Sequence, residues 1–569
     1  MTLAAPIDVA SILAQIEAAP GIARLRSLSA SHAQADVATV DAVMRQAARF
    51  CADHLAPVNA SGDHQGCSLE GGRVRVPAGY PEAWRAYVDA GWPTLDHPEA
   101  IGGQGLPLFL AASVQQLVDS SCAAFGMLPV LQRSAARLIA THGSDALKAE
   151  WLPALVSGEW AASICISEAD AGSDVARLRT TAQPTGGSAW SITGEKMWIS
   201  FGDHALTPRI GHCLLARSPK GLSLFLTPST LADESGAMVA NAIVVRRVET
   251  KMGLHGSPTC ALGFEGATGW LIGEEGRGLQ QLFVMITNMR LSAGVQGLAL
   301  AAAALDVAMP YAADRRQGGP VSAPAVPIAD HADVRRMLLE MTARVETLRG
   351  LSLAIAVQAD LAAGDHDLVA RAEASALVQW LLPIFKTIGG EAGFEVASDA
   401  IQVLGGAGYT REWPVEQLLR DARIATIYEG TTGMQSIDLL HRRLWRGAGE
   451  GLTVFLRLAR ADIADADDDI RVPVAACLDR LVNAAQHLAA LQTAPWEAEA
   501  GATAFLRLAG LAATGWIAAR LATLGDATPV WRRLAAAGRY DLADLADRAA
   551  MAHANAIRGA GPLKLFEAL

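Results

Sequence analysis

Apolar residues recur at helical spacing in the first part of the chain. The pattern covers the segments Val37–His54, Glu82–Ala90, Leu108–Val118 and Arg133–His142. An apolar residue at every third or fourth position is typical of a helix with one face on a core. Residues 36–160 are therefore predicted to form a helical domain, and residues 1–35 an N-terminal extension.

The pattern changes between residues 161 and 275. Short runs rich in β-branched and aromatic residues alternate with Gly, Pro and Ser turns, as in SITGEKMWIS and GLSLFLTP. Strands joined by such turns indicate a small β-domain or barrel. A β-domain is therefore predicted at the centre of the chain.

Long helical patterns return between residues 276 and 445. They cover Leu279–Arg315, His331–Gly364, Leu368–Leu404 and Gly433–Arg446. After Trp445 the sequence RGAGEG predicts a linker. A second helical domain is expected at 276–445 and an extra helical region at 446–569.

The composition supports a mainly α fold with a central β-domain. Of the 569 residues, 51% are hydrophobic and only 5% aromatic, so small aliphatic side chains must fill several cores. The net charge of −11, without a run of Lys and Arg, argues against a nucleic-acid partner. The seven cysteines lack CxxC spacing and the thirteen histidines lack ligand spacing, so we expect no metal, no disulfide framework and a cytoplasmic location.

The sequence gives no sign of a signal peptide or a membrane span. The first residues lack a basic region, and Asp8 and Glu17 interrupt their apolar pattern. No run of 18 residues is continuously apolar, so no membrane helix is expected.

The most informative chemistry lies in Gln402–Gln435, where a glycine-rich turn, an Arg-Asp dipeptide and a lone glutamate precede a helix. Glu429 follows the apolar run Ile424–Tyr428 and precedes Gly430. Burial raises the pKa of a carboxylate and makes it a stronger base, as removal of a proton beside a thioester carbonyl requires. The alternative is an acidic residue that only favours the start of the next helix.

The whole segment resembles the C-terminal signature of the acyl-CoA dehydrogenase family, whose members oxidise acyl-CoA thioesters with FAD. By this resemblance Glu429 is the catalytic base, and Tyr428 and Gly430 lie beside the substrate. The resemblance also implies that four residues contact FAD, namely Gln402, Gly405, Gly406 and Thr431.

Two further motifs resemble flavin-binding segments of the family. In ICISEADAGSD the matching residues are Ile164, Ile166 and Ser167 on FAD and Ser173 near the acyl-CoA. The family's usual Thr-Glu-Pro is Ser-Glu-Ala here, and the loss of proline is expected to loosen the turn. On sequence alone this string also fits an ordinary polar turn.

The second motif, GEKMWIS, resembles the family segment in which a tryptophan lies against the flavin and a hydroxyl reaches its N5 atom. Its residues Trp198, Ile199 and Ser200 are therefore expected at the cofactor. The alternative is a tryptophan that belongs to the core of the β-domain.

Two arginines also match family positions. Arg315 matches an arginine that reaches the FAD pyrophosphate of a neighbouring subunit. Arg290 falls beside the active site, but the Asp that commonly stands three residues before it is Thr287, so its usual ion partner is predicted to be missing. Some relatives carry their base one residue before this arginine, where this chain has Met289, so the resemblance leaves Glu429 as the base.

The resemblance implies a helical domain, a β-barrel and a four-helix bundle, followed by the extra C-terminal helical domain. That domain is typical of a longer subgroup that includes 3-methylmercaptopropionyl-CoA dehydrogenase, and it implies a homodimer without a membrane partner. The implied reaction is α,β-dehydrogenation of an acyl-CoA with an electron-transfer flavoprotein as acceptor, while the acyl chain stays undetermined. The alternatives are an acyl-CoA oxidase that uses oxygen, a flavin-bearing relative that binds nucleic acid, and a catalytically silent scaffold.

Overall fold

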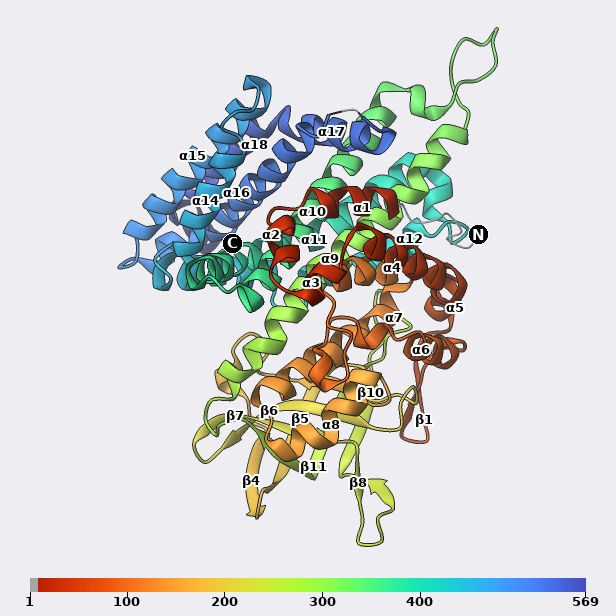
Figure 1. Ribbon diagram of the computed structural model, residues 1–569, viewed down its shortest axis with the longest axis vertical. Helices are drawn as coiled ribbons and strands as arrows, with labels where there is room; N and C mark the ends of the chain where they lie inside the picture. The colour runs from red at the N-terminus through yellow and green to blue at the C-terminus, as the bar shows by residue number, and fades with distance from the viewer. Residues whose placement is uncertain (1–8, 526) are drawn as a thin grey trace.

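Helices form the upper two thirds of the molecule and a β-domain forms its lower end (Figure 1). The computed structural model describes residues 9–525 and 527–569. The fold is mainly helical with a central β-domain, which confirms the predicted fold class.

The described part of the predicted N-terminal extension, residues 9–35, is helical and packs against the bundle, while residues 1–8 lie outside the described residues. Ser11 and Gln15 both donate hydrogen bonds to the buried carboxylate of Glu346 on α10 (Ala332–Gly364), at 2.8 and 2.7 Å. The helices of the extension are α1 (Val9–Glu17), α2 (Ile22–Ser27) and α3 (Ala30–Gln34).

The first domain is built around one long buried helix, α7 (Leu108–His142). The helical segments predicted at Leu108–Val118 and Arg133–His142 both lie in α7, on either side of a kink at Cys122, whose φ and ψ of −159° and 87° are not helical. The middle part of α7 is buried on every side, so it carries no amphipathic pattern. The other elements are α4 (Val37–Phe50), a π-helical turn (Cys51–Leu55), α5 (Ala56–Gln65), β1 (Ser68–Glu70), β2 (Arg73–Arg75), α6 (Tyr80–Asp89), two 3₁₀ turns (Trp92–Thr94 and Glu99–Ile101) and α8 (Asp145–Ser157).

The β-domain closes into a small barrel. Its strands follow the order β10, β11, β5, β4, β6, β3, and β7 pairs with both β11 and β6, so five strands form a ring. Ile192, Ile199, Leu214, Phe225 and Phe264 fill its core. The strands are β3 (Ala161–Cys165), β4 (Thr181–Gly186), β5 (Ala189–Ser200), β6 (Ile210–Ser218), β7 (Gly221–Pro228), β10 (Ile243–Val248) and β11 (Thr259–Ile272), with a separate hairpin of β8 (Thr230–Ala232) and β9 (Met238–Ala240) and a 3₁₀ turn (Val175–Arg177).

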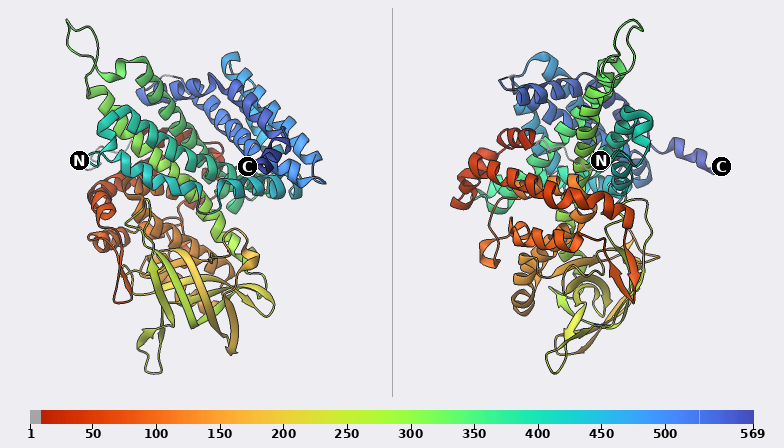
Figure 2. Two further views of the ribbon diagram at one scale, coloured as in Figure 1. Left: turned by 180° about the vertical axis from the view of Figure 1, so that it is seen from behind. Right: turned by 90° about the vertical axis from the view of Figure 1, so that its right-hand side faces the viewer.

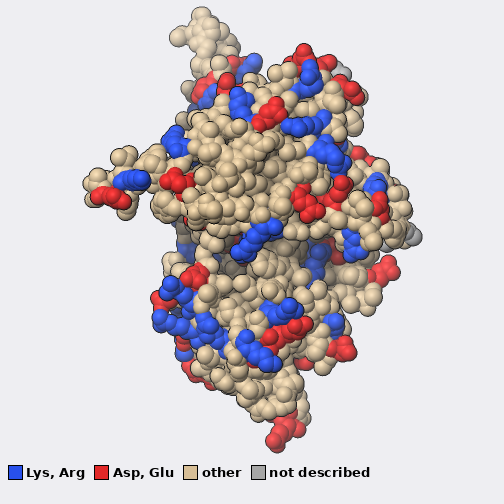
Figure 3. All heavy atoms as spheres, turned by 90° about the vertical axis from the view of Figure 1, so that its left-hand side faces the viewer, with Lys and Arg blue, Asp and Glu red and all other residues tan. Residues whose placement is uncertain are grey.

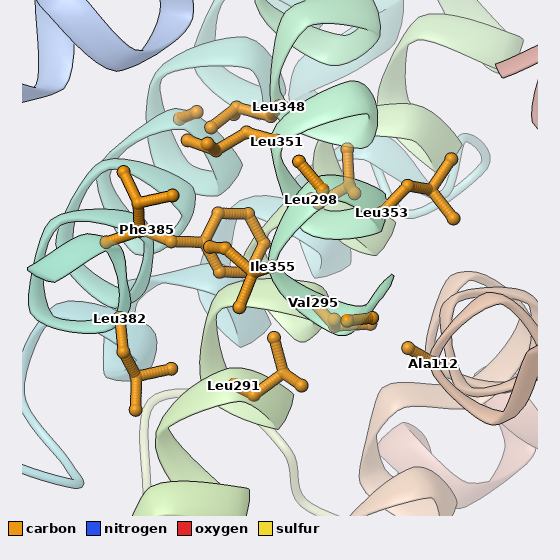
Figure 4. Packing of buried hydrophobic residues seen from close by; sticks show 14 of the residues in the cluster. Ala112, Leu291, Val295, Leu298, Leu348, Leu351, Leu353, Ile355, Leu382 and Phe385 are labelled. Atoms are coloured by element: carbon orange, nitrogen blue, oxygen red, sulfur yellow. The ribbon is translucent and has the colours of Figure 1, made fainter. Parts of the chain in front are cut away.

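Three long helices form the main body of the bundle. Side chains from these helices and from α7 fill the space between them, and Figure 4 shows Phe385 beside Ile355. The long helices are α9 (Gly278–Asp314), α10 (Ala332–Gly364) and α11 (Leu368–Leu404). The shorter elements are a 3₁₀ turn (Ile328–Asp330), a second 3₁₀ turn (Gly405–Tyr409), α12 (Val415–Ala422), a third 3₁₀ turn (Arg423–Thr426), α13 (Thr432–Ile437) and a π-helix (Asp438–Arg446).

Glycines bring the backbones of α9 and α11 into direct contact. A Cβ atom on Gly297 would lie 2.1 Å from the carbonyl oxygen of Gly389, and one on Gly393 would lie 2.8 Å from that of Gly297. At the adjacent position, a Cβ atom on Gly390 would lie 2.8 Å from the carbonyl oxygen of Ala425. The two helices and the segment that leads to Glu429 therefore meet at one level of the bundle.

The C-terminal region packs against the bundle through α10, α11 and α13. The predicted linker is only a short turn at residues 447–449, because a helix begins at Glu450. At its end the chain leaves the body and projects outward (Figure 2). The helices are α14 (Glu450–Asp462), α15 (Asp468–Ala490), α16 (Pro495–Ala522), α17 (Pro529–Leu542), α18 (Leu545–Ala556) and a final 3₁₀ helix (Gly561–Ala568).

Within residues 9–525 and 527–569, four helices are long and apolar enough to cross a membrane, although the sequence has no continuous apolar run. Three of their apolar windows are mostly buried inside the protein, by 94% in α7, 83% in α9 and 72% in α16. The fourth, Leu368–Tyr409, is 44% buried. Packing within the fold accounts for the apolar surface of the first three, and the expected absence of a membrane partner stays a prediction.

Candidate active site

Glu429 lies in a short loop between the 3₁₀ turn Arg423–Thr426 and α13, and this loop has an unusual backbone. Glu429 has a φ of +55° and Gly430 a φ of +89°. The Glu429 carbonyl accepts a hydrogen bond from Gln435 Nε2 at 2.9 Å, and the Gly430 carbonyl accepts one from Lys386 Nζ at 2.6 Å. With both carbonyls held in this way, the Glu429 N–H has no acceptor among the residues that the structure describes.

The side chain of Glu429 lines a small cavity between α7, α9 and its own loop. Most of its wall is apolar. Its lining residues are Asp119, Met127, Val130, Leu131, Met289, Ser292, Ala293, Gln296, Tyr428 and Glu429. A carboxylate here faces a space that suits a short aliphatic group.

Two opposite effects act on the pKa of Glu429. Burial raises the pKa of its carboxyl above the ordinary value, while the charges of Lys386 and Arg290 pull that pKa down. Burial also lowers the pKa of Lys386 to about 8. At neutral pH Lys386 is therefore mostly protonated, and Glu429 is a stronger base than an exposed glutamate.

Arg290 has a different ion partner in place of the one that is missing at position 287. Its Nη1 lies 3.1 Å from Oδ2 of Asp438, which is buried at the start of the π-helix. Arg442 and Arg443 contact the same carboxylate at 2.9 and 3.4 Å. The partner comes from a later element, and the only sequence signal for it is the spacing of four and five residues between Asp438 and the two arginines.

The adjacent residues Arg420 and Asp421 face different partners. Arg420 contacts Asp63 of α5 at 2.7 Å and Glu416 at 2.8 Å. Asp421 is buried and accepts the N–H of Leu254 at 2.5 Å, and burial raises its pKa to about 6. The dipeptide therefore joins the bundle to the first domain and to a loop of the β-domain.

Trp198 lies at the surface of the β-domain rather than in its core. Its side chain is 56% exposed and its φ is +63°. Ser167 and Ser200 are half-buried, and their hydroxyls have no partner within residues 9–525 and 527–569. Ile199 is buried in the barrel core, so its side chain points away from this surface.

The turn that carries Ile164, Ile166 and Ser167 is well held despite the missing proline. Ile164 and Ile166 are half-buried, and the Ser167 carbonyl accepts the N–H of Met197 at 2.9 Å. Lys196 Nζ donates to the Ile166 carbonyl at 2.9 Å and to Glu168 at 2.8 Å. The expected loosening is therefore offset by a buried lysine, while Ser173 lies exposed farther along the same loop.

Arg315, Gln402, Gly405 and Gly406 lie exposed near the far end of the bundle. Tyr311, one helical turn before Arg315, donates a hydrogen bond to the Leu404 carbonyl at 3.3 Å, so the ends of α9 and α11 meet here. On α9, 22 residues separate Tyr311 from Met289 in the cavity wall, which corresponds to roughly 33 Å along a helix. One chain therefore does not bring these residues to Glu429.

Thr431 and Tyr428 also have structural partners. The Thr431 hydroxyl accepts the N–H of Met434 at 3.3 Å and caps α13. The Tyr428 hydroxyl donates to Gln296 Oε1 at 2.8 Å inside the cavity wall. In the described part of the chain, no group of three or more His, Cys, Asp or Glu residues is arranged to hold a metal ion.

Sequence comparison finds three family models along the chain. They are described as the N-terminal, middle and C-terminal domains of acyl-CoA dehydrogenase and match residues 38–159, 163–267 and 276–444. The chain is 38% identical to 3-methylmercaptopropionyl-CoA dehydrogenase of Ruegeria pomeroyi, over 94% of this chain and 95% of that protein. It is 32% identical to the broad-specificity linear acyl-CoA dehydrogenase FadE5 of Mycobacterium tuberculosis, over 80% and 79% of the two chains.

Structure comparison gives the same fold. An acyl-CoA dehydrogenase of Bacillus anthracis complexed with FAD matches with a TM-score of 0.76 at 19% identity. The match covers 94% of this chain and 91% of that one, so the extra C-terminal helices are included.

Proposed function

Because this chain belongs to the acyl-CoA dehydrogenase family, we propose that it oxidises a short acyl-CoA thioester to the 2-enoyl-CoA with Glu429 as the base. The observation that carries this proposal is the position of Glu429 in the wall of a small, mostly apolar cavity. The relative from Ruegeria pomeroyi is named for a short acyl-CoA substrate.

The loop geometry supplies two parts of the reaction. The Glu429 carboxylate accepts the α-proton of the thioester, and its raised pKa makes this transfer more favourable. The Glu429 N–H, which has no acceptor among the described residues, donates to the thioester carbonyl and stabilises the negative charge that develops there. Lys386 and Gln435 hold the loop in the conformation that presents this N–H.

The surface around Trp198 fits the FAD that the family uses. An exposed indole offers a flat apolar face, and the hydroxyls of Ser167 and Ser200 offer free hydrogen-bonding groups beside it. When bound, FAD accepts the two electrons that leave the substrate with the β-hydrogen.

We propose that a second copy of the chain completes the cofactor site in a homodimer. Arg315, Gly405 and Gly406 are expected at FAD, yet they lie roughly 33 Å along the bundle from the Glu429 cavity. On a symmetric partner the same residues reach the cofactor of the first chain. This arrangement accounts for an exposed, glycine-lined surface where a Cβ atom on either glycine would meet nothing within 4 Å.

The outward C-terminal segment provides a test of this dimer. Its side chains Leu563, Leu565, Phe566 and Leu569 are 47%, 74%, 77% and 100% exposed, which is unusual for an apolar cluster unless a partner covers it. Removal of residues 561–569 is expected to weaken the dimer by at least 10-fold in Kd, measured by light scattering across a dilution series. Met551→Ser, at an exposed residue of α18, is the control. An unchanged Kd after truncation would exclude this segment from the interface.

Replacement of Lys386 tests the electrostatics around Glu429. Loss of its positive charge in Lys386→Met raises the pKa of Glu429, so more of the base is protonated at a given pH. The acid limb of the profile of kcat/KM against pH is expected to shift to higher pH. Lys386→Arg keeps the charge and should shift the limb much less, whereas equal profiles for Lys386→Met and wild type would contradict the role of this lysine.

We propose an electron-transfer flavoprotein as the acceptor and the cytoplasm as the location. All seven cysteines are unpaired and six are buried, which supports a reducing compartment. On the face in Figure 3, most of the surface is uncharged, and groups of Lys and Arg alternate with Asp and Glu, which supports the absence of a nucleic-acid partner. Formation of hydrogen peroxide at the turnover rate would replace the flavoprotein proposal with oxygen as acceptor.

The experiment that tests the function is an anaerobic titration of the FAD-loaded protein with a panel of acyl-CoA thioesters. Loss of flavin absorbance with short chains is the expected result, and the 2-enoyl-CoA is then identified by mass spectrometry. A flavin that no thioester on the panel reduces would overturn the proposal.

A further inference from the structure

A second carboxyl group lines the Glu429 cavity, and only one of its two oxygens has a hydrogen-bond partner among the described residues. Asp119 of α7 is 1% exposed. Its Oδ1 accepts a hydrogen bond from Gln115 Nε2 at 2.9 Å, and Gln115 in turn accepts one from Arg133. Its Oδ2 is buried and has no hydrogen-bond partner among the described residues. A polar atom left in this state costs free energy unless a ligand binds it.

The fold makes room for this carboxyl. A Cβ atom on Gly126 would lie 1.8 Å from Asp119 Oδ1, so no other residue type fits at position 126 while Asp119 keeps its place. Gln115 Nε2 bonds both Asp119 and the Gly126 carbonyl, across the bend of α7 at Cys122. The bent helix, the glycine and the glutamine together hold Asp119 at the cavity wall.

The other polar groups of the wall already have partners. Gln296 Oε1 accepts the Tyr428 hydroxyl, and Gln296 Nε2 contacts the Met127 sulfur at 3.3 Å. Gln296 also lies close to Asp119 and lowers the pKa of its carboxyl. Burial raises the pKa of Asp119 to about 8, so its carboxyl is mostly neutral at pH 7 and can both donate and accept a hydrogen bond.

We propose that the preferred substrate is a short, uncharged acyl-CoA with a hydrogen-bonding heteroatom near the end of its acyl chain, and that Asp119 binds this atom. The inference rests on the proposed function, in which the α-carbon lies at Glu429. The cavity is small and its lining is mostly apolar, so it suits a short acyl chain better than a long one. A chain that ends in a carboxylate is disfavoured, since it would bring a second negative charge close to Glu429.

Pairs of acyl-CoAs with the same shape test this specificity. Pentanoyl-CoA, 3-methoxypropionyl-CoA and 4-hydroxybutyryl-CoA differ by the exchange of one carbon for oxygen. The wild type is expected to favour at least one of the oxygen-bearing thioesters over pentanoyl-CoA by about 10-fold or more in kcat/KM, because only these satisfy Asp119. Asp119→Leu is expected to remove this preference and to favour pentanoyl-CoA.

A matched variant separates hydrogen bonding from folding. Asp119→Asn keeps the size and the hydrogen-bonding capacity of the side chain and is expected to keep the preference within about 3-fold. The inference would be overturned by equal kcat/KM values for the three thioesters in the wild type, or by an unchanged preference in Asp119→Leu. In either case, oxidation of pentanoyl-CoA would still support the proposed function. Failure of every thioester to reduce the flavin would instead overturn the proposed function and this inference with it.

Discussion

Replacement of Glu429 with glutamine is expected to lower the rate of flavin reduction by an acyl-CoA by about 10²- to 10⁴-fold. The amide has nearly the same shape as the carboxylate but cannot accept the α-proton. Since the backbone of the loop is held by Lys386 and Gln435, the N–H that faces the thioester carbonyl stays in place. The measurement is anaerobic stopped-flow spectroscopy of the FAD-loaded enzyme with saturating thioester.

Two controls define this result. Glu412→Gln changes an exposed glutamate of the same segment and should leave the rate, the FAD content and the melting temperature unchanged. Because Asp119 is the second carboxyl in the cavity, any residual rate in Glu429→Gln should be compared with that of the double variant Glu429→Gln/Asp119→Asn. A wild-type rate in Glu429→Gln would show that another group is the base.

The order of the domains could be predicted because each kind of element has its own periodicity on a half-buried face. The residues between the two predicted segments of α7 carried no such signal, because the middle of α7 is buried all round. The linker predicted after Trp445 is only a short turn in the structure, for a different reason. Glycines there fit a tight turn of three residues as well as a flexible connection.

The candidate site could be predicted where the chemistry is local in sequence. Glu429, Tyr428 and Gly430 are consecutive, and the structure places the first two in the cavity wall. Lys386, Gln296 and Asp119 were missed because each is a single polar residue inside an apolar helix, where sequence alone indicates only packing. Their role depends on the close contact of α9 and α11 and on the bend of α7, which arise from tertiary structure.

Asp438 is buried in the bundle and forms an ion pair with Arg290 beside the active site, so its replacement is expected to have the largest effect on the stability of the fold. In Asp438→Asn the side chain keeps its size but loses the charge that faces Arg290, Arg442 and Arg443 at 3.1, 2.9 and 3.4 Å. Arg290 is only 11% exposed and would then be a buried charge without its carboxylate. Loss of one member of such a buried group typically costs about 3–5 kcal/mol, which should appear as a clear fall in melting temperature at a fixed scan rate.

The surrounding arginines provide the matched controls for this prediction. Arg442→Met removes the most exposed of the three, 44% exposed, and should change the melting temperature little. Addition of Arg443→Met to Asp438→Asn should restore part of the loss, because it removes one of the unpaired charges. Arg290 also lowers the pKa of Glu429. If Arg290 moves away from Glu429 in Asp438→Asn, the pKa of Glu429 rises. The acid limb of the profile of kcat/KM against pH should then shift to higher pH as the melting temperature falls. An unchanged melting temperature in Asp438→Asn would show that the carboxylate of Asp438 is not needed to stabilise these arginines in the folded protein.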